Sequence, residues 1–417
     1  MRITRLAIPA ALVLLASTLV ASSPATAASP AGNKHLTAKI TASNHLVVDW
    51  HATSAARYYL VRTSSTLDMS HNIKTYKVSK KHTKYTIDAT ASRYNYAKPS
   101  SGNYIFVRVY APKTNGNLIT SPAKAVRLNP PAAPAGAQQV KVATFNVRTA
   151  DLDVPHHGWA SRITPVADRI NASGASVVAL EEAGTNLGKT TFRGGYDIHW
   201  QFEDVERAAA PQYDLVYSDE YAKGANTGKE GTRILYDTSK LSVVSSGFFA
   251  PSAVNKYLRW VPWALFQDRS TGEQFYFIAA HLDNRADKGK SHTYYNLRLK
   301  QIKKIIDVAR DFRSAGHQVI LAGDLNSNIY SKPDNGVDRK LMSAGFYDAY
   351  ATANNVNSYH VTYNDFKKSK VNASRTDYIM TFGRADLRGA YSYKNWISKS
   401  DGVYPSDHNM QSAVVPF

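Results

Sequence analysis

Six positions along the chain follow or open short apolar runs, and each carries a side chain that can bind metal or phosphate. Carboxylate and amide oxygens suit hard divalent cations, and imidazole can move a proton near neutral pH. One such residue after an apolar run is commonplace, but six in order favour a site that binds a metal or a phosphate. In chain order the residues are Asn146, Glu182, His281, Asp324 with Asn326, Asp377, and Asp407 with His408.

The elements that must position these residues are buried strands alternating with helices. Apolar runs of strand length cover residues 141–145, 177–180, 275–280 and 319–322, and helical spacing covers 162–170 and 294–312. This alternation predicts a layered α/β domain between residues 139 and 417. Because ligand sites of layered sheets gather at strand ends, we expect the six positions to meet at one edge.

The order of these motifs resembles that of the endonuclease/exonuclease/phosphatase superfamily. Residues 145–149, Phe-Asn-Val-Arg-Thr, are particularly similar to the start of deoxyribonuclease I. Trp159 and Arg162, with Arg298 in a later helix, resemble the secreted members, which include phosphatases and lipid phosphodiesterases. The resemblance implies a deoxyribonuclease-I-like α/β sandwich of two sheets.

The chemistry of phosphodiester hydrolysis assigns a role to most of the candidates. His408 is the expected general base, and the resemblance implies that Asp377 fixes its tautomer. Asp324 and Asn326 would orient the water or contact the phosphate, and His281 would donate to a phosphoryl oxygen. Asp283, two residues after His281, is expected to be structural.

The remaining candidates concern the metal and the phosphate. Glu182 is expected to bind a divalent cation, Mg²⁺ first, with Mn²⁺ or Ca²⁺ as alternatives. Asn146 and Asp407 would complete or support that shell. For Arg148 and Arg233, phosphate contact and surface ion pairing are equally expected.

Two positions depart from the family pattern. Glu181 stands where members usually carry glutamine, and could join the metal shell or lie behind it. The stretch after Glu182 is Ala-Gly-Thr, without the arginine that deoxyribonuclease I places against the minor groove. The second departure argues against duplex DNA as the natural substrate.

The first part of the chain differs in character from the rest. Residues 1–27 combine Arg2 and Arg5, an apolar stretch and an Ala-x-Ala pattern, which indicates a secretory signal peptide. Short alternating runs in residues 34–128 predict an all-β sandwich that resembles a fibronectin type III module, with Trp50 as a core residue. A Pro/Ala-rich linker, residues 129–138, follows.

Charge is concentrated in that first module. The chain of 417 residues has no cysteine and a formal net charge of +19. Residues 34–128 hold fifteen lysines and arginines against three aspartates. Such an excess is either a solubility device or an anchor on a polyanion.

These observations predict a secreted, monomeric, metal-dependent phosphodiesterase without a transmembrane segment. A nuclease acting on nucleic acid is the first interpretation. A hydrolase of phospholipid head groups or of another small phosphoester, sphingomyelinase-like in kind, is the second. A non-catalytic polyanion-binding protein is the third.

Overall fold

A computed structural model describes the chain from Leu36 onward, with gaps. The described residues are 36–40, 45–64, 69, 73–88, 104–121, 124–127, 134–150, 157–184, 200–216, 231–251, 259–288, 291–328, 331–352, 354–358, 360–369, 374–383, 387, 389–397 and 404–417. The predicted signal peptide and the first half of the predicted linker, residues 129–133, lie outside them. Within the described residues, no helix has the length and apolar character needed to cross a membrane.

The first eight strands form two antiparallel sheets. One sheet has the order β1-β2-β5, and the other has the order β4-β3-β6-β7 with β8 also paired to β6. Their facing side chains share a hydrophobic cluster that contains Trp50, which is 1% exposed. The strands are β1 (Leu36–Ile40), β2 (His45–Trp50), β3 (Tyr58–Ser64), β4 (Lys74–Ser79), β5 (Lys84–Asp88), β6 (Tyr104–Pro112), β7 (Leu118–Thr120) and β8 (Lys124–Arg127).

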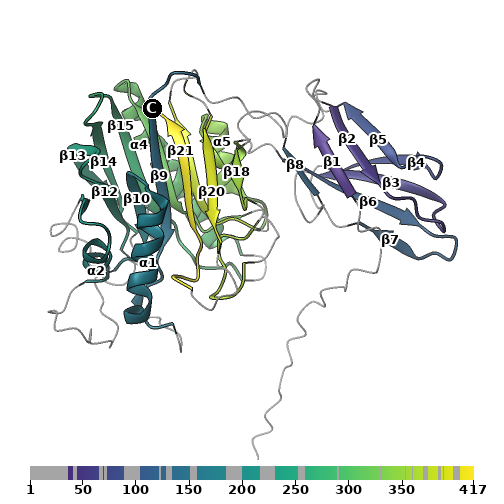
Figure 1. Ribbon diagram of the computed structural model, residues 1–417, viewed down its shortest axis with the longest axis horizontal. Coiled ribbons are helices and arrows are strands. Elements are labelled where there is room, and N and C mark those ends of the chain that lie inside the picture. Colours follow the sequence, from purple (N-terminus) through teal and green to yellow (C-terminus); the bar gives the residue numbers. More distant parts are fainter. Residues whose placement is uncertain are drawn as a thin grey trace, which may run out of the picture.

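Two larger sheets follow, packed face to face (Figure 1). The seven-stranded sheet has the order β11-β12-β10-β9-β21-β20-β18. Its strands are β9 (Gln139–Asn146), β10 (Val177–Glu181), β11 (Tyr213–Leu215), β12 (Arg233–Asp237), β18 (Asn355–Val356), β20 (Ser392–Trp396) and β21 (Met410–Pro416). The six-stranded sheet has the order β13-β14-β15-β16-β19-β17. Its strands are β13 (Leu241–Phe249), β14 (Val261–Asp268), β15 (Gln274–His281), β16 (Gln318–Asp324), β17 (Tyr347–Asp348) and β19 (Asp377–Phe382).

Helices cover the outer faces of this sandwich. Helices α1 (Trp159–Ser173) and α2 (Gln201–Ala208) share a cluster with the outward residues of β9 and β10. Helices α4 (Thr293–Ser314) and α5 (Gly336–Ala344) share one with β15, β16 and β19. A short 3-10 turn, η3 (Ala349–Ala351), follows β17. The predicted runs and both predicted helices are therefore present, and α1 begins three residues earlier than its spacing indicates, at Trp159.

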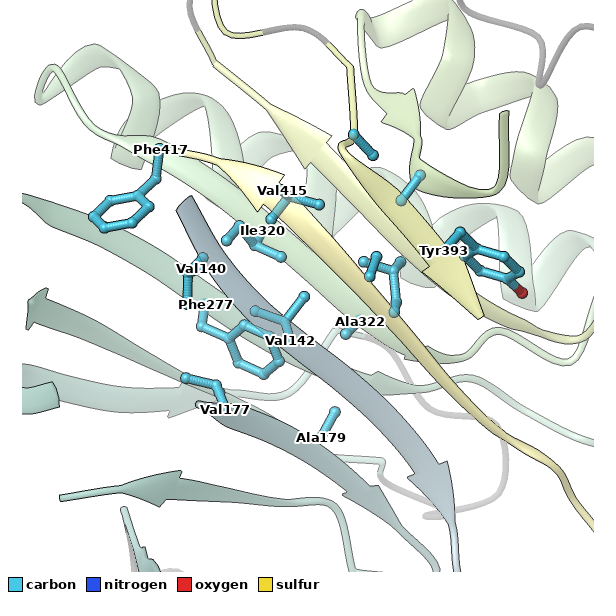
Figure 2. Packing of buried hydrophobic residues seen from close by; sticks show 14 of the residues in the cluster. Val140, Val142, Val177, Ala179, Phe277, Ile320, Ala322, Tyr393, Val415 and Phe417 are labelled. Atoms are coloured by element: carbon cyan, nitrogen blue, oxygen red, sulfur yellow. The ribbon is translucent and has the colours of Figure 1, made fainter. Parts of the chain in front are cut away.

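The core between the two sheets is built from alternate residues of each strand. Val140 and Val142 of β9, Phe277 of β15, and Ile320 and Ala322 of β16 meet there (Figure 2). Because strand side chains alternate between faces, Asn146, His281 and Asp324 continue the same inner rows. The inner face is thus apolar along its length and becomes polar at one end, where β9, β15 and β16 stop.

A glycine allows the closest approach at that end. Gly323 has φ +157°, and a Cβ there would lie 1.8 Å from the carbonyl oxygen of Ala280 on the neighbouring strand. The parallel register pairs Ala280 with Gly323 and His281 with Asp324. Gly323 therefore lets β15 and β16 bring two candidate residues side by side.

Candidate active site

Strand register assembles the candidate residues in two facing rows. On one sheet His281, Asp324 and Asp377 are direct neighbours across β15, β16 and β19. On the other sheet Asn146 is paired with Glu181 across β9 and β10. Burying so many polar groups is costly unless they bond to one another or serve a ligand. The candidates named from the sequence are therefore brought together at one end of the sandwich.

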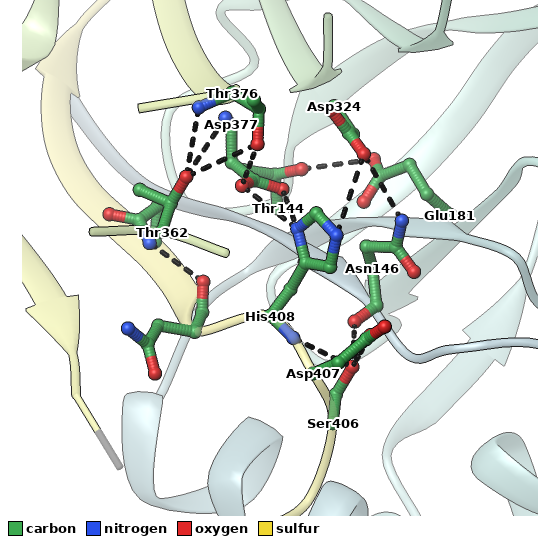
Figure 3. Close-up of polar contacts among 12 residues, drawn as sticks. Thr144, Asn146, Glu181, Asp324, Thr362, Thr376, Asp377, Ser406, Asp407 and His408 are labelled. Atoms are coloured by element: carbon green, nitrogen blue, oxygen red, sulfur yellow. Dashed lines mark hydrogen bonds and ion pairs between the residues drawn. The ribbon is translucent and has the colours of Figure 1, made fainter. Parts of the chain in front are cut away.

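His408 and Asp377 form a hydrogen-bonded pair at the centre of the site (Figure 3). Nδ1 of His408 lies 3.0 Å and 3.1 Å from the two carboxylate oxygens of Asp377. Burial alone would lower the pKa of His408, but the carboxylates of Asp377, Asp324 and Asp407 raise that pKa well above its usual value. The pairing holds the ring with Nε2 as its free nitrogen.

Ser406 fixes the backbone that carries His408. Its hydroxyl donates to the carbonyl oxygen of Asn146 at 2.6 Å and accepts from the backbone N–H of His408 at 3.1 Å. The last turn before β21 is thereby tied to the end of β9.

Asp324 is the point on which the other groups converge. Its Oδ2 accepts from Nδ2 of Asn146 at 3.2 Å and lies 3.6 Å from Nε2 of His281 and 3.8 Å from Nε2 of His408. Burial, and then the charge of Asp377, raise the pKa of Asp324 to about 7. Asp324 therefore holds a proton more readily than an exposed carboxyl group does.

Glu182 lies beside Asn146 in a strained backbone conformation. Its Oε1 accepts from Nδ2 of Asn146 at 3.2 Å, and its Oε2 accepts from the backbone N–H of Thr149 at 2.9 Å. Its φ is +58°, which is uncommon outside glycine. Among described residues, Arg148, Asn326 and Asp365 share positive φ and line the same cavity. Strain gathered in this way is typical of a functional site.

The cavity over this row has a volume of about 570 Å³. Arg148 on its wall lies 3.3 Å from Asp407, and burial raises the pKa of Asp407. Carboxylates, amides and basic groups all face this space. Its lining includes Arg148, Glu182, Asp324, Asn326, Asp407 and His408 from the sequence prediction, with Tyr363, Asp365 and Lys367 besides.

Three predicted residues take other places. His281 is 1% exposed and is absent from the cavity lining, so its predicted contact with a phosphoryl oxygen stays a prediction. Arg233 is 3% exposed, with its guanidinium over the ring of Phe202, and does not line the cavity. Its predicted phosphate contact or ion pair therefore stays a prediction. Asp283 binds Arg285, in keeping with a structural role.

The unusual Glu181 is fully buried behind Asn146. Its Oε1 accepts from the hydroxyl of Thr144 at 2.9 Å, and within the described part of the chain its Oε2 has no hydrogen-bond partner. Burial, followed by the charges of Asp377 and Asp324, raises the pKa of Glu181 well above its usual value. A protonated carboxyl group has nearly the shape of the glutamine amide expected at this position from the family resemblance. Glu181 therefore lies behind the cavity rather than on its wall.

Two buried arginines hold the loops around the site. Arg162 donates to the carbonyl oxygens of Val147 at 2.6 Å and Pro405 at 3.1 Å, which lie just after Asn146 and shortly before His408 in the chain. Arg298 donates to the carbonyl oxygens of Asp283 and Arg285 after β15. The sequence marked both arginines by resemblance alone, and the structure shows their contacts.

Sequence reasoning missed the segment from Thr362 to Phe366. Tyr363 is 47% exposed, and its ring centroid lies 5.1 Å from that of His408. The hydroxyl of Thr362 accepts from the backbone N–H of Thr376, next to Asp377. This irregular segment has no periodicity that could mark it as part of a site.

Two places in the described residues have the donors for a divalent cation. Asp324, Asp377 and His408 offer ligand atoms within 4.8 Å of one another. However, Nδ1 of His408 already bonds to Asp377, so a cation among these three would compete with that bond. Glu182, Asn146 and Asp407 offer carboxylate and amide oxygens, the kind of ligand that a hard cation prefers, and Nδ1 of His408 is not among them.

Comparison with known proteins now bears on this arrangement. The profile described as "Endonuclease/Exonuclease/phosphatase family" matches residues 143–408, which spans both rows and His408. The chain belongs to the endonuclease/exonuclease/phosphatase family. It is accordingly a phosphoric ester hydrolase, and family members generally depend on a divalent metal.

Solved structures agree with this family in fold. An endonuclease/exonuclease/phosphatase from Bacteroides vulgatus is 21% identical, with TM-score 0.53, over 67% of this chain and 99% of that one. A mannosyl-6-phosphatase from Bacteroides thetaiotaomicron is 20% identical, with TM-score 0.51, over 66% and 99%. A functionally unknown conserved protein from Enterococcus faecalis is 21% identical, with TM-score 0.52, over 66% and 100%. No curated protein sequence matches the chain.

Proposed function

We propose that this family member is an exported nuclease that hydrolyses phosphodiester bonds with the help of a divalent cation, Mg²⁺ in the first place. The observation that carries the proposal is the His408–Asp377 pair, whose free Nε2 faces Asp324 at the edge of a cavity lined by Glu182 and Asp407. This arrangement offers a proton acceptor, a set of charged oxygens and a cavity of about 570 Å³ for the substrate.

In the proposed mechanism, His408 moves the proton at Nε2. Asp377 keeps Nδ1 protonated, and the pair accepts a proton from the attacking water. Asp324, with a pKa of about 7, lies close enough to orient that water or to share the proton. Arg148, on the cavity wall, is paired with Asp407. A cation bound to Asp407 would weaken this ion pair, and Arg148 would then attract a phosphate oxygen.

Glu182, Asn146 and Asp407 are the proposed holders of the cation. When bound, the cation supplies positive charge that stabilises the phosphoryl oxygens as negative charge develops. Positive charge there would also oppose the rise in the pKa of His408, which favours the unprotonated ring that a base requires.

Nucleic acid is the favoured substrate because the cavity offers more than a phosphate site. Tyr363 presents an exposed ring beside His408, and Lys367 adds a basic group on the same wall. The basic excess of residues 34–128 also favours a polyanion. The absence of an arginine at Ala183 or Gly184 favours single-stranded over duplex substrates.

Hydrolysis of a small phosphoester is the second candidate. The same missing arginine supports it, together with the similarity in fold to a mannosyl-6-phosphatase. Export stays part of the proposal and rests on the N-terminal sequence pattern, and the monomeric state stays an expectation.

A substrate panel tests the proposal. Purified protein with Mg²⁺, or with EDTA, is incubated with single-stranded DNA, RNA, plasmid DNA, sphingomyelin and mannose 6-phosphate. We expect Mg²⁺-dependent cleavage of the single-stranded polymers at the highest rate. Fastest turnover of mannose 6-phosphate or sphingomyelin would replace nuclease by the second candidate.

A further inference from the structure

Two arginines lie directly opposite each other on the outer face of the β4-β3-β6-β7 sheet. The antiparallel register of β3 and β6 pairs Arg62 with Arg108. Side chains opposed in this way have Cβ atoms about 5 Å apart, and like charges at such positions destabilise a sheet. Within the described residues, neither guanidinium group has a carboxylate or hydrogen-bonding partner, and Nε of each is buried without one. The fold alone does not account for this pair.

Aromatic rings flank the pair on the same face. The guanidinium of Arg62 lies over the ring of Tyr110 at 4.7 Å, and Nζ of Lys77 lies over the ring of Tyr58 at 4.6 Å. Side chains alternate between the two faces along β3 and β6, and Tyr59, Val61 and Val109 point into the buried cluster. The rings and cations at the alternate positions therefore face outward. Stacked guanidinium groups and tyrosines are the surface on which unpaired bases stack, while arginines bind the phosphates between them.

The face also adjoins the catalytic sandwich. Phe106, two residues before Arg108 on the same side of β6, is buried in the hydrophobic cluster that contains Val140 and Tyr350. A polymer lying on the face would thus be held next to the unit that cleaves it, which raises its local concentration there.

We propose that the outer face of β3, β4 and β6 binds single-stranded nucleic acid, with Arg62 and Arg108 on the phosphates and Tyr58 and Tyr110 beneath the bases. The face is hereafter called the arginine–tyrosine face. The inference rests on the proposed nuclease function for the class of its partner. Because it concerns binding away from the cavity, it can be tested without turnover.

The test measures binding of the full chain in EDTA, so that hydrolysis cannot interfere. Fluorescence anisotropy of labelled oligo(dT) of about 20 nucleotides is compared between wild type, Arg62→Gln/Arg108→Gln and Lys80→Gln/Lys81→Gln. The last variant removes the same charge from exposed positions of the β4–β5 turn, outside the face. We expect the arginine variant to bind at least about tenfold more weakly and the lysine variant less than about threefold. Loss of two phosphate contacts should lower the slope of log Kd against log salt by about 1.4.

Two further probes separate base stacking from charge. Tyr110→Leu should weaken binding of oligo(dT) about fivefold or more and leave binding of inorganic polyphosphate unchanged, since polyphosphate has no bases to stack. Vesicles of phosphatidylglycerol should bind no more tightly to wild type than to the arginine variant. Equal losses in the arginine and lysine variants, polyphosphate binding as tight as that of oligo(dT), or selective vesicle binding would each overturn the proposal.

Folding and catalysis serve as internal checks. Removing the opposed charges should leave the melting temperature equal or higher, whereas a structural role for the pair would lower it. Turnover of bis(p-nitrophenyl) phosphate should be the same in wild type and in the arginine variant. Binding of oligo(dT) without any cleavage of it would defeat the nuclease proposal but leave the arginine–tyrosine face intact. Cleavage of oligo(dT) without binding outside the cavity would support the nuclease proposal and defeat the proposed role of the arginine–tyrosine face.

Discussion

Nδ1 of His408 donates to Asp377 at 3.0 Å, so the ring presents only Nε2 to the cavity. His408→Ala should therefore lower kcat by about 100-fold or more, the usual contribution of general acid–base catalysis. Asp377→Asn should also lower kcat, because the tautomer is no longer fixed. Steady-state rates and circular dichroism measure the two effects. His317→Ala is the matched control, because His317 precedes the first residue of β16 and lies at the end of that strand away from the site. A His408 variant with kcat within twofold of wild type would refute the assignment.

Removal of the divalent cation should abolish hydrolysis, and Mg²⁺ should restore it. Glu182→Gln keeps the shape of the side chain but removes its charge, so about tenfold or more extra Mg²⁺ should be needed for half-maximal rate. Rates across a Mg²⁺ titration after dialysis against EDTA measure this requirement. Glu273→Gln, on an exposed turn, should titrate like wild type. Full activity in excess EDTA would contradict the mechanism.

Stability of the metal-free protein should fall as the pH rises because of Glu181. Burial and the charges of Asp377 and Asp324 raise its pKa in the folded state, so the folded protein holds a proton that the unfolded chain releases above its usual value of 4.5. The stability supplied by that proton is present at low pH and is lost as the pH rises toward the raised pKa, by up to about 1.4 kcal/mol per pH unit.

Glu181→Gln should remove this dependence. Urea unfolding in EDTA at pH 5 and pH 8 should show a smaller loss of stability in the variant than in wild type. Parallel pH profiles for both proteins would mean that the carboxyl group is ionised in the folded state.

Tyr363 should contribute to binding rather than to proton transfer. Because its exposed ring lies beside His408, Tyr363→Ala should raise KM for an oligonucleotide about fivefold or more, as loss of one stacked base predicts. Tyr363→Phe keeps the ring and should behave like wild type. Steady-state kinetics on oligo(dT) separate KM from kcat, and equal KM in all three proteins would remove Tyr363 from the substrate site.

Gly323→Ala should prevent normal folding of the sandwich. Its Cβ would overlap the carbonyl oxygen of Ala280, so β15 and β16 would have to separate, at a cost of about 3 kcal/mol or more. Gly316→Ala is the control, since it also has positive φ but no atom within 4 Å of the added carbon. Thermal melts of both variants measure the difference, and similar melting temperatures would show that the strands can yield.

Much of the sandwich and its site was predictable because buried strands have recognisable apolar sequences. The runs before Asn146, His281 and Asp324 are continuous and apolar, and the change to a polar residue marks the strand end. His281 and Asp324 meet through the parallel register that the alternation of strands and helices implies, and Asn146 meets Asp324 because the two sheets pack face to face. The part of the site carried by regular elements was therefore accessible from sequence.

The rest depended on contacts between segments that have no pattern of their own. Tyr363 lies in an irregular stretch, and its place beside His408 follows from an isolated bridge between the two residues. Arg233 was predicted from its charge, but its position on β12 places its guanidinium group over the ring of Phe202. Arg62 and Arg108 are 46 positions apart, so only the register of β3 and β6 shows that they face each other.

Asn146, His281 and Asp324 occupy inner positions that continue the rows of the hydrophobic core. Selection for stability and selection for catalysis therefore favour different residues at these positions. Valine or isoleucine at these inner positions would extend the core and favour the folded state, while only the polar residues permit turnover. A lineage released from its catalytic task should therefore drift first at these strand ends, toward aliphatic residues and higher heat resistance. Retention of all three polar side chains in this chain is what continued use of the enzyme would preserve.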